Sequence, residues 1–392
     1  MTVLAEDSGP RWMRRLSILI PPFDQADVPP PPRTLAAFFR WGLAGTWPVL
    51  WAASVASALA GCAEVVSAMF LGWVIDTATS NGPTGLFDNH GVLFLTITVF
   101  LIALRPLVFG LSAAFQAVVL NPNLNVLVLS RLHRWTLGQD VTFFDNDFAG
   151  RIAQKQMQAA RALTEVTVEA INTVVFALAS IIATGILVVS INWRVGAVLA
   201  VWLVGYLWFI KTYLPRIRSR AEGRAAARAG VTGQVVDTIT NIKTVKLFAH
   251  ADYEDRAAVG AMATYRDKTL AFGYVSTNFR FYLMIIAGIL PVLMVGTTLW
   301  LWSMSIATTG DIAATGTVAV RIAQMTGWVS FTLMGLYANI GEVEDGMHTL
   351  TPPHRLINTE HAAELALSRE IRFDTVTFAY GRESGGIIDV NL

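Results

Sequence analysis

The stretch from Val92 to Leu137, VLFLTITVFLIALRPLVFGLSAAFQAVVLNPNLNVLVLSRLHRWTL, decides the fold. Its first part is apolar enough to cross a bilayer, and its second part keeps a composition typical of helix. A single helix of this length would measure about 69 Å at about 1.5 Å per residue, more than twice the hydrocarbon thickness. The helix must therefore cross the membrane and continue far into the aqueous phase.

The composition of the whole chain is that of a membrane protein. Of its 392 residues, 54% are hydrophobic and only 15% are charged, against roughly 25% charged in soluble domains. Six apolar blocks are long enough to cross hydrocarbon. They are Trp47 to Val74, Val92 to Leu120, Ile171 to Ser190, Val195 to Ile210, Phe281 to Trp302 and Thr315 to Leu336. We therefore expect an all-α membrane protein with six long transmembrane helices.

The distribution of basic residues predicts the topology. The loops Thr79 to Gly91 and Ser303 to Gly316 contain no Lys or Arg, whereas the connections on the other side are rich in both. Because basic residues gather on the cytoplasmic side, we expect a multi-pass protein of the cell inner (plasma) membrane with both termini cytoplasmic. The net charge of +1 is explained by this topology, so membrane lipid is the expected partner and nucleic acid is not.

The two inner connections are far longer than the outer ones. They run roughly from Asn121 to Ala170 and from Lys211 to Arg280, and their composition is helical throughout. We expect each to be an out-and-back helical hairpin that extends a pair of spans into the cytoplasm. Glycine-rich stretches predict the two tips, at Gly138 to Gly150 and at Gly223 to Gly233.

Composition also divides the chain into four parts. Residues 1–32 form a cytoplasmic tail with six prolines between Pro21 and Pro32. Residues 33–357 form the membrane domain, which opens with a short helix expected to lie in the inner interface on Phe38, Phe39 and Trp41; alternatively, that helix is the start of the first span. Residues 358–369 form a linker, and residues 370–392 open a strand-like soluble domain.

Three stretches carry a family resemblance. The first is Phe143-Phe144-Asp145 followed by Gly150, the second is Ile242 to Phe248 (IKTVKLF), and the third is Ile371 to Gly381 (IRFDTVTFAYG). In this order, and at these distances from six spans, they resemble the ABC exporter family, in which a six-helix transmembrane domain is fused to a nucleotide-binding domain.

The resemblance implies functions for particular residues. It makes the hairpin tips coupling helices, which carry Phe143, Phe144, Asp145, Gly150, Ala225, Gly230 and Gly233, and it makes Ile242 to Phe248 part of the helix that returns from the second hairpin. It places Tyr380 against the adenine of ATP, although this side chain could simply be an aromatic at a strand end. Phe143 and Phe144 could likewise pack only on their own hairpin. The family further implies ATP and Mg as cofactors of the intact transporter, and a homodimer or a heterodimer of half-transporters.

The motifs of ATP hydrolysis do not occur in the chain. There is no match to G-x-x-x-x-G-K-[ST], whose backbone N–H groups and lysine hold phosphates. The resemblance implies that residues 370–392 are only the first strands of an α/β nucleotide-binding domain. We therefore expect this chain to be unable to hydrolyse ATP alone. The six histidines show no metal-binding spacing, and no metal site is expected.

Ionisable residues at membrane depth are candidates for function, because an unpaired charge there is costly. Counted from the outer ends of their spans, Glu64 lies about 15 Å deep and Arg105 about 20 Å deep, so the two could form an ion pair. This pair either shapes a translocation cavity or is a structural bridge. Arg321, only about 9 Å from its outer interface, could contact an anionic substrate together with Gln324, or could snorkel to the interface.

The sequence thus predicts the transmembrane part of an ATP-driven exporter that works by alternating access. The substrate could be a lipid, drug, peptide or conjugate. An ion-gradient-driven secondary transporter is the first alternative, and it would be expected to show repeated spans and broken helices at mid-membrane. A membrane scaffold without transport activity is the second.

Overall fold

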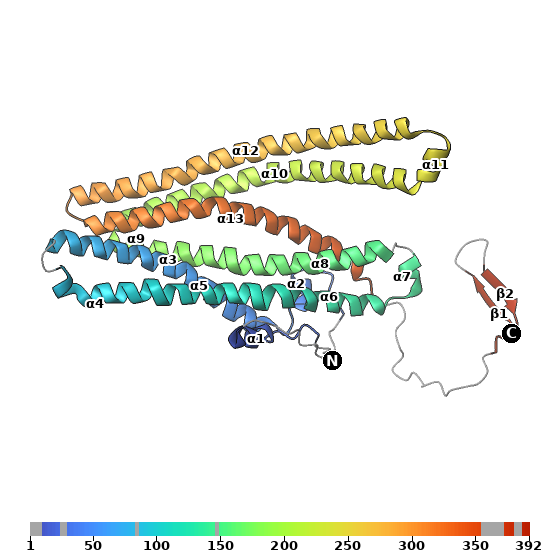
Figure 1. The fold of residues 1–392 in the computed structure, drawn as a ribbon, viewed down its shortest axis with the longest axis horizontal. Coiled ribbons are helices and arrows are strands. Elements are labelled where there is room, and N and C mark those ends of the chain that lie inside the picture. Colours follow the sequence, from blue (N-terminus) through green and yellow to red (C-terminus); the bar gives the residue numbers. More distant parts are fainter. Residues whose placement is uncertain (1–9, 24–29, 83–85, 146–148, 354–371, 380–385) are drawn as a thin grey trace.

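The structure is a computed structural model that describes residues 10–23, 30–82, 86–145, 149–353, 372–379 and 386–392. It is a bundle of long helices whose two hairpin tips lie at one end of the molecule (Figure 1). Its helices are α1 (Arg11–Ser17), α2 (Leu35–Gly42), α3 (Trp47–Asn81), α4 (Leu86–Val99), η1 (Phe100–Leu104), α5 (Arg105–Ala114), η2 (Phe115–Leu120), α6 (Asn121–Leu137), α7 (Val141–Asp145), α8 (Ala149–Glu169), η3 (Ala170–Val175), α9 (Phe176–Ile191), α10 (Trp193–Thr240), α11 (Ile242–Leu247), α12 (Ala251–Ser303) and α13 (Thr309–Leu350).

The π-helical segments η1, η2 and η3 join shorter helices without a break in the chain direction. The described residues therefore form six long continuous helices, here called rods: α3, α4 to α6, α8 to α9, α10, α12 and α13. Among the described residues, five rods are long and apolar enough to cross a membrane by length and composition, at 47–81, 90–137, 150–191, 193–240 and 251–303. The sixth predicted span lies within α13, which packs against α3, α8 and α12. A helix with protein on several sides needs fewer apolar residues than one facing lipid, which explains why α13 has no stretch as apolar as those of the other five rods.

Prolines account for two of the π-helical segments. Pro106 and Pro122 each follow one of them closely, and a proline has no N–H to donate and crowds the carbonyl four residues back. The helix widens instead: the N–H of Arg105 donates to the carbonyl of Phe100, and that of Asn121 donates to Gln116. The local widening places Arg105 at the start of a new helical segment.

Small residues on α3 bring its backbone close to that of α9. A Cβ on Gly61 would lie 2.6 Å from the carbonyl oxygen of Phe176, so only glycine fits at this crossing. The Ser57 hydroxyl donates to the carbonyl of Ile171 at 2.8 Å. Close backbone approach through small residues, with a hydroxyl bonded across the contact, is the usual way in which membrane helices pack.

The short helix α2 forms where the sequence predicted a helix, but its aromatic residues are not free to anchor it in the interface. Phe38 and Trp41 are buried in a cluster with Leu124 and Val128 of α6. The guanidinium of Arg131 donates to the carbonyls of Trp41, Gly42 and Ala44 at 2.8–2.9 Å, closing the end of α2. The expectation that Phe38 and Trp41 face lipid was therefore wrong, because protein already covers them.

The first hairpin turns where predicted, at α7, and the second does not. α10 continues as a helix through Ala225, Gly230 and Gly233 to Thr240, and the tip is α11 with its flanking turns. The stretch Ile242 to Phe248 is thus the tip and not the returning helix. A glycine costs a helix only about 1 kcal/mol relative to Ala, which is too little to break a rod packed along α12.

The C-terminal residues form a small antiparallel sheet. β1 (Val376–Ala379) pairs with β2 (Gly386–Val390), with Phe378 opposite Ile387. The predicted strand therefore exists, although it begins at Val376. The linker at 358–369 and Tyr380 lie outside the described residues.

Candidate functional site

Three charged side chains meet inside the helix bundle. The Glu64 Oε1 atom lies 2.9 Å from an Arg105 guanidinium nitrogen and 2.9 Å from an Arg321 guanidinium nitrogen. The Glu64 side chain is only 9% exposed, whereas those of Arg105 and Arg321 are 38% and 42% exposed. The carboxylate is therefore the buried centre of the cluster, and the two arginines extend from it toward the surrounding space.

Each member comes from a different rod. Glu64 lies on α3, Arg321 on α13, and Arg105 at the point where η1 gives way to α5. The Arg105 guanidinium also lies 5.2 Å from the centre of the Phe109 ring, one turn further along, which is within the range of a cation–π contact. The pairing of Glu64 with Arg105 agrees with the similar membrane depths that the sequence predicts for them.

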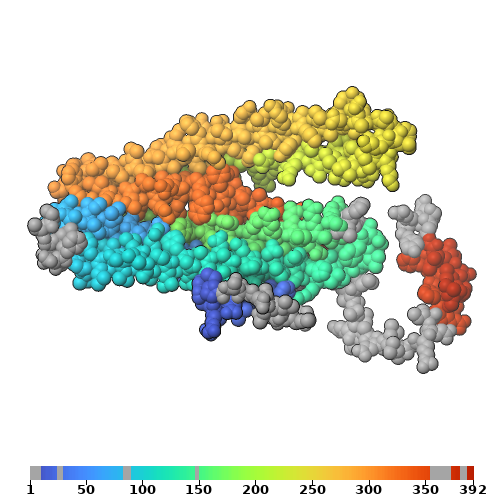
Figure 2. Space-filling model, viewed as in Figure 1, coloured from blue at the N-terminus to red at the C-terminus, as the bar shows by residue number. Residues whose placement is uncertain are grey.

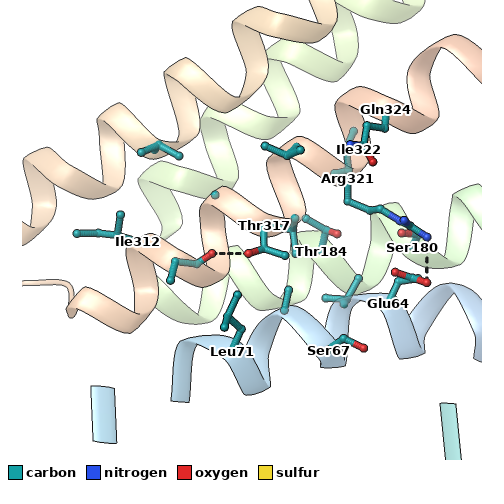
Figure 3. Close-up of a pocket in the computed structure, with 17 residues that line it drawn as sticks. Glu64, Ser67, Leu71, Ser180, Thr184, Ile312, Thr317, Arg321, Ile322 and Gln324 are labelled. Atoms are coloured by element: carbon teal, nitrogen blue, oxygen red, sulfur yellow. Dashed lines mark hydrogen bonds and ion pairs between the residues drawn. The ribbon is translucent and has the colours of Figure 1, made fainter. Parts of the chain in front are cut away.

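The place of Arg321 differs from the expectation. The helix that carries it begins at Thr309, six residues before the predicted span, so Arg321 lies about 18 Å from the outer end at about 1.5 Å per residue. It is therefore too deep to snorkel outward, and it turns to Glu64 instead (Figure 3). The charged cluster is a triad, where the sequence predicted a pair and a separate arginine.

A cavity of 680 Å³ opens beside this triad between α3, α9, α12 and α13. Glu64, Arg321 and Gln324 line it, whereas Arg105 does not. Its other polar lining residues are Ser67, Ser180, Thr184 and Thr317, and the rest of its wall is apolar (Figure 3). The cavity has the size and mixed lining of a site for a small amphipathic molecule.

The charge balance of the triad favours an anion. Two guanidinium groups face one carboxylate, which leaves one positive charge uncompensated within it. The Nε atoms of Arg105 and Arg321 are buried, and neither has a hydrogen-bond partner in the part of the chain that the structure describes. Guanidinium groups bind carboxylates and phosphates through paired N–H donors.

A second polar cavity, of 500 Å³, lies nearer the hairpin tips and was not predicted. Glu165, Glu169 and Asn339 line it, and the Asn339 amide donates to Glu165 at 2.9 Å. The Glu165 carboxylate also accepts a hydrogen bond from Arg161, which raises the pKa of that guanidinium above its ordinary value. The sequence feature that could have indicated this cavity is the pair Glu165 and Glu169 on α8, directly before the third predicted span.

The outer ends of α3 and α13 are joined by a carboxylate. Asp76 accepts hydrogen bonds from the Gly310 N–H at 2.6 Å and from the Thr308 hydroxyl at 2.7 Å. A Cβ on Gly72 would lie 2.7 Å from the carbonyl oxygen of Gly310, so the two backbones touch here. This contact joins the two helices at the end of the bundle away from the hairpin tips, and sequence reasoning missed it.

At the other end, α7 presents the predicted tip residues. The Asp140 carboxylate accepts a hydrogen bond from the Phe143 N–H at 2.9 Å and so starts the helix. Phe143 packs partly on the core of its own hairpin. Phe144 meets the Phe143 ring edge-on at 5.2 Å and stays 38% exposed, and Asp145 and Gly150 are exposed as well.

Comparisons with known proteins agree with this architecture. Residues 50–327 match the family described as ABC transporter transmembrane region. An uncharacterized ABC transporter ATP-binding protein of Haemophilus influenzae is 27% identical over 92% of this chain and 58% of its own length. An ATM1-type heavy metal exporter of Novosphingobium aromaticivorans is 28% identical over 68% of this chain and 46% of its own length.

The solved structure of a bacterial Atm1-family ABC exporter with ATP bound superposes with a TM-score of 0.68 at 14% identity, covering 89% of this chain and 61% of that one. It supports the fold. The present chain spans about half the length of the curated relatives. Because the family match covers most of the chain and the six rods have the corresponding arrangement, this membrane protein belongs to the ABC transporter transmembrane family.

Proposed function

We propose that this chain is the membrane-spanning part of an ATP-driven exporter that moves an amphipathic, anionic substrate by alternating access. The observation that carries the proposal is the triad of Glu64, Arg105 and Arg321 beside the 680 Å³ cavity, in a chain of this family. An excess positive charge next to an apolar wall suits a molecule with an acidic head and an apolar body.

A dimer is part of the proposal. The half of the α10–α12 hairpin nearest its tip has few buried side chains. Among the described residues, none is buried between Ile217 of α10 and Val245 at the tip, and none is buried between the tip and Phe279 of α12. This half stands apart from the other helices in Figure 2. It exposes Val236, Ile239, Val259, Met262 and Tyr274. An apolar face of this length needs a partner, and a second half-transporter, identical or related, would supply it.

Nucleotide-binding domains, with ATP and Mg, complete the proposed transporter on the cytoplasmic side. The two tips α7 and α11 lie at the same end of the bundle (Figure 1). α10 is 48 residues long, or about 72 Å at about 1.5 Å per residue. Rods of this length would transmit closure of the ATPase domains at the tips to the membrane cavity.

The test uses the complete protein, with its nucleotide-binding domain, in the inner membrane or in proteoliposomes. ATPase activity is measured against amphiphiles that share one tail and carry an anionic, zwitterionic or cationic head. We expect stimulation by the anionic compound, and we expect Arg321→Gln to raise its half-maximal concentration about tenfold, the effect of one lost charge-assisted contact. Equal stimulation by all three heads would contradict the anionic substrate, and no ATP-dependent transport in either direction would contradict the exporter.

The coupling role of α7 gives a separate prediction. Replacing Phe143 and Phe144 together by Ala should lower substrate-stimulated ATPase activity and transport about tenfold or more, because exposed aromatic residues of this kind are typical anchors of an interface. Because Phe143 packs partly on its own hairpin, the single variant Phe144→Ala is measured as well: it should lose activity while the thermal midpoint of the membrane domain changes little, since Phe144 is exposed. Met157→Ala, at an exposed position of α8 on the same hairpin, is the matched control. Full activity of the double variant would show that the two rings serve only their own hairpin.

A further inference from the structure

The N-terminal segment 10–23, which the sequence assigned to a cytoplasmic tail, is fixed to the bundle. Ile20 is only 1% exposed and lies in the same apolar cluster as Leu120 and Leu124. The Asn123 amide donates to the carbonyl of Ser17 at 2.9 Å, and the Ser130 hydroxyl donates to that of Pro22 at 3.2 Å. The segment is therefore attached along η2 and the first turns of α6.

The opposite side of this segment is both apolar and basic. Trp12, Ile18 and Phe23 are 51%, 73% and 70% exposed. Arg11, Arg14 and Arg15 are exposed among them, and residues 10–23 contain no Asp or Glu. Large apolar side chains beside arginines, without acidic residues, are typical of a segment that lies in the interface of an anionic membrane.

The position of the segment along the bundle fits that surface. α1 packs against η2, where the apolar second span gives way to the polar sequence Asn121-Pro122-Asn123. It projects sideways from the bundle about halfway along its length, as the blue element in Figure 2. In the proposed topology this is the level of the cytoplasmic headgroups. The inference rests on that topology.

We propose that residues 10–23 are a binding surface for anionic phospholipids of the cytoplasmic leaflet. Trp12, Ile18 and Phe23 insert beside the headgroups, and the three arginines bind their phosphates. This surface takes the role that the sequence assigned to α2, whose Phe38 and Trp41 are buried in protein. Because the segment is held by Asn123 and Ser130, lipid bound there also steadies the point where α6 leaves the membrane.

The test places a polarity-sensitive fluorophore on the full chain at Ile18→Cys, with Cys62, the single native cysteine, replaced by Ala. The protein is reconstituted in phosphatidylcholine nanodiscs with increasing phosphatidylglycerol. We expect the emission to shift to the blue as phosphatidylglycerol is added, and we expect lipid-borne spin labels to quench it more than aqueous iodide does. Because each arginine near an anionic surface adds to the attraction, the Arg11, Arg14 and Arg15→Gln variant should need at least about tenfold more phosphatidylglycerol for the same shift.

The matched control removes the same charge elsewhere, by replacing Arg220, Arg228 and Arg256 with Gln, at exposed positions on α10 and α12. It should leave the shift unchanged. The proposal is overturned if both triple variants behave alike, if iodide quenches the probe and lipid labels do not, or if the shift depends on protein concentration, which would indicate a protein partner. A probe at Leu247→Cys, on the second tip, checks the topology separately: quenching there by lipid labels would contradict the cytoplasmic hairpins themselves.

Discussion

Replacing Glu64 with Gln should destabilise the membrane domain and abolish transport by the complete protein. Gln has nearly the same shape, so the change removes a charge and leaves the packing. The guanidinium groups of Arg105 and Arg321, both 2.9 Å from the same carboxylate oxygen, would then face each other without an anion. Breaking a fully buried pair costs about 3–5 kcal/mol. Because both arginines are partly exposed, we expect about 1–3 kcal/mol here.

The measurement is the thermal midpoint in nanodiscs, together with substrate transport. A loss of this size corresponds to a Tm lower by about 2–6 °C. The informative control exchanges charges within the triad: Glu64→Arg combined with Arg321→Glu keeps one carboxylate and two guanidinium groups in place. This double variant should recover most of the Tm that the single variants lose. If Glu64→Gln were as stable as the parent, or if the exchange recovered nothing, the triad would not be an interacting unit.

The triad also shows how far the sequence could predict the site. Charges at membrane depth stand out against an apolar background, and the rise per residue was enough to match Glu64 with Arg105. Arg321 was placed wrongly because α13 begins at Thr309 within a run of small and polar residues, which has no apolar edge to mark its start. The membrane depth of a residue is underestimated when it is counted from the edge of an apolar run and the helix extends beyond that edge.

The hairpins also show which features the sequence could predict and which it could not. Their existence followed from length alone, because a rod of about 70 Å cannot end inside a bilayer about 30 Å thick. The second tip could not be placed by glycine content, since Gly230 and Gly233 lie inside α10 and the turn is at Asn241 to His250. The burial of Phe38 and Trp41 against α6 was beyond the sequence as well, because an amphipathic stretch does not reveal whether lipid or protein covers its apolar side.

Replacing Gly310 with Ala should have the largest effect on the outer side of the bundle. A Cβ at this position would collide with the carbonyl oxygen of Gly72 and with the Asp76 carboxylate. Both are held in place, the first by the α3 backbone and the second by its hydrogen bonds to Thr308 and to Gly310 itself. Overpacking costs about 1–3 kcal/mol, and loss of the capping carboxylate about 1 kcal/mol more. We therefore expect a destabilisation of about 2–4 kcal/mol.

The same helix provides a matched control, because a Cβ on Gly327 would meet nothing within 4 Å. Gly327→Ala should raise the Tm slightly, since Ala favours helix over Gly by about 1 kcal/mol, whereas Gly310→Ala should lower it. Spin labels at Ser80→Cys, near the end of α3, and at Ser305→Cys, in the connection between α12 and α13, should report a longer distance in the Gly310→Ala variant only. In the proposed alternating-access cycle, the contact between α3 and α13 would have to break for the cavity to open outward. A variant that separates the two helices should therefore populate an outward-open arrangement without ATP, and equal label distances in both variants would show that this contact does not hold the outer side closed.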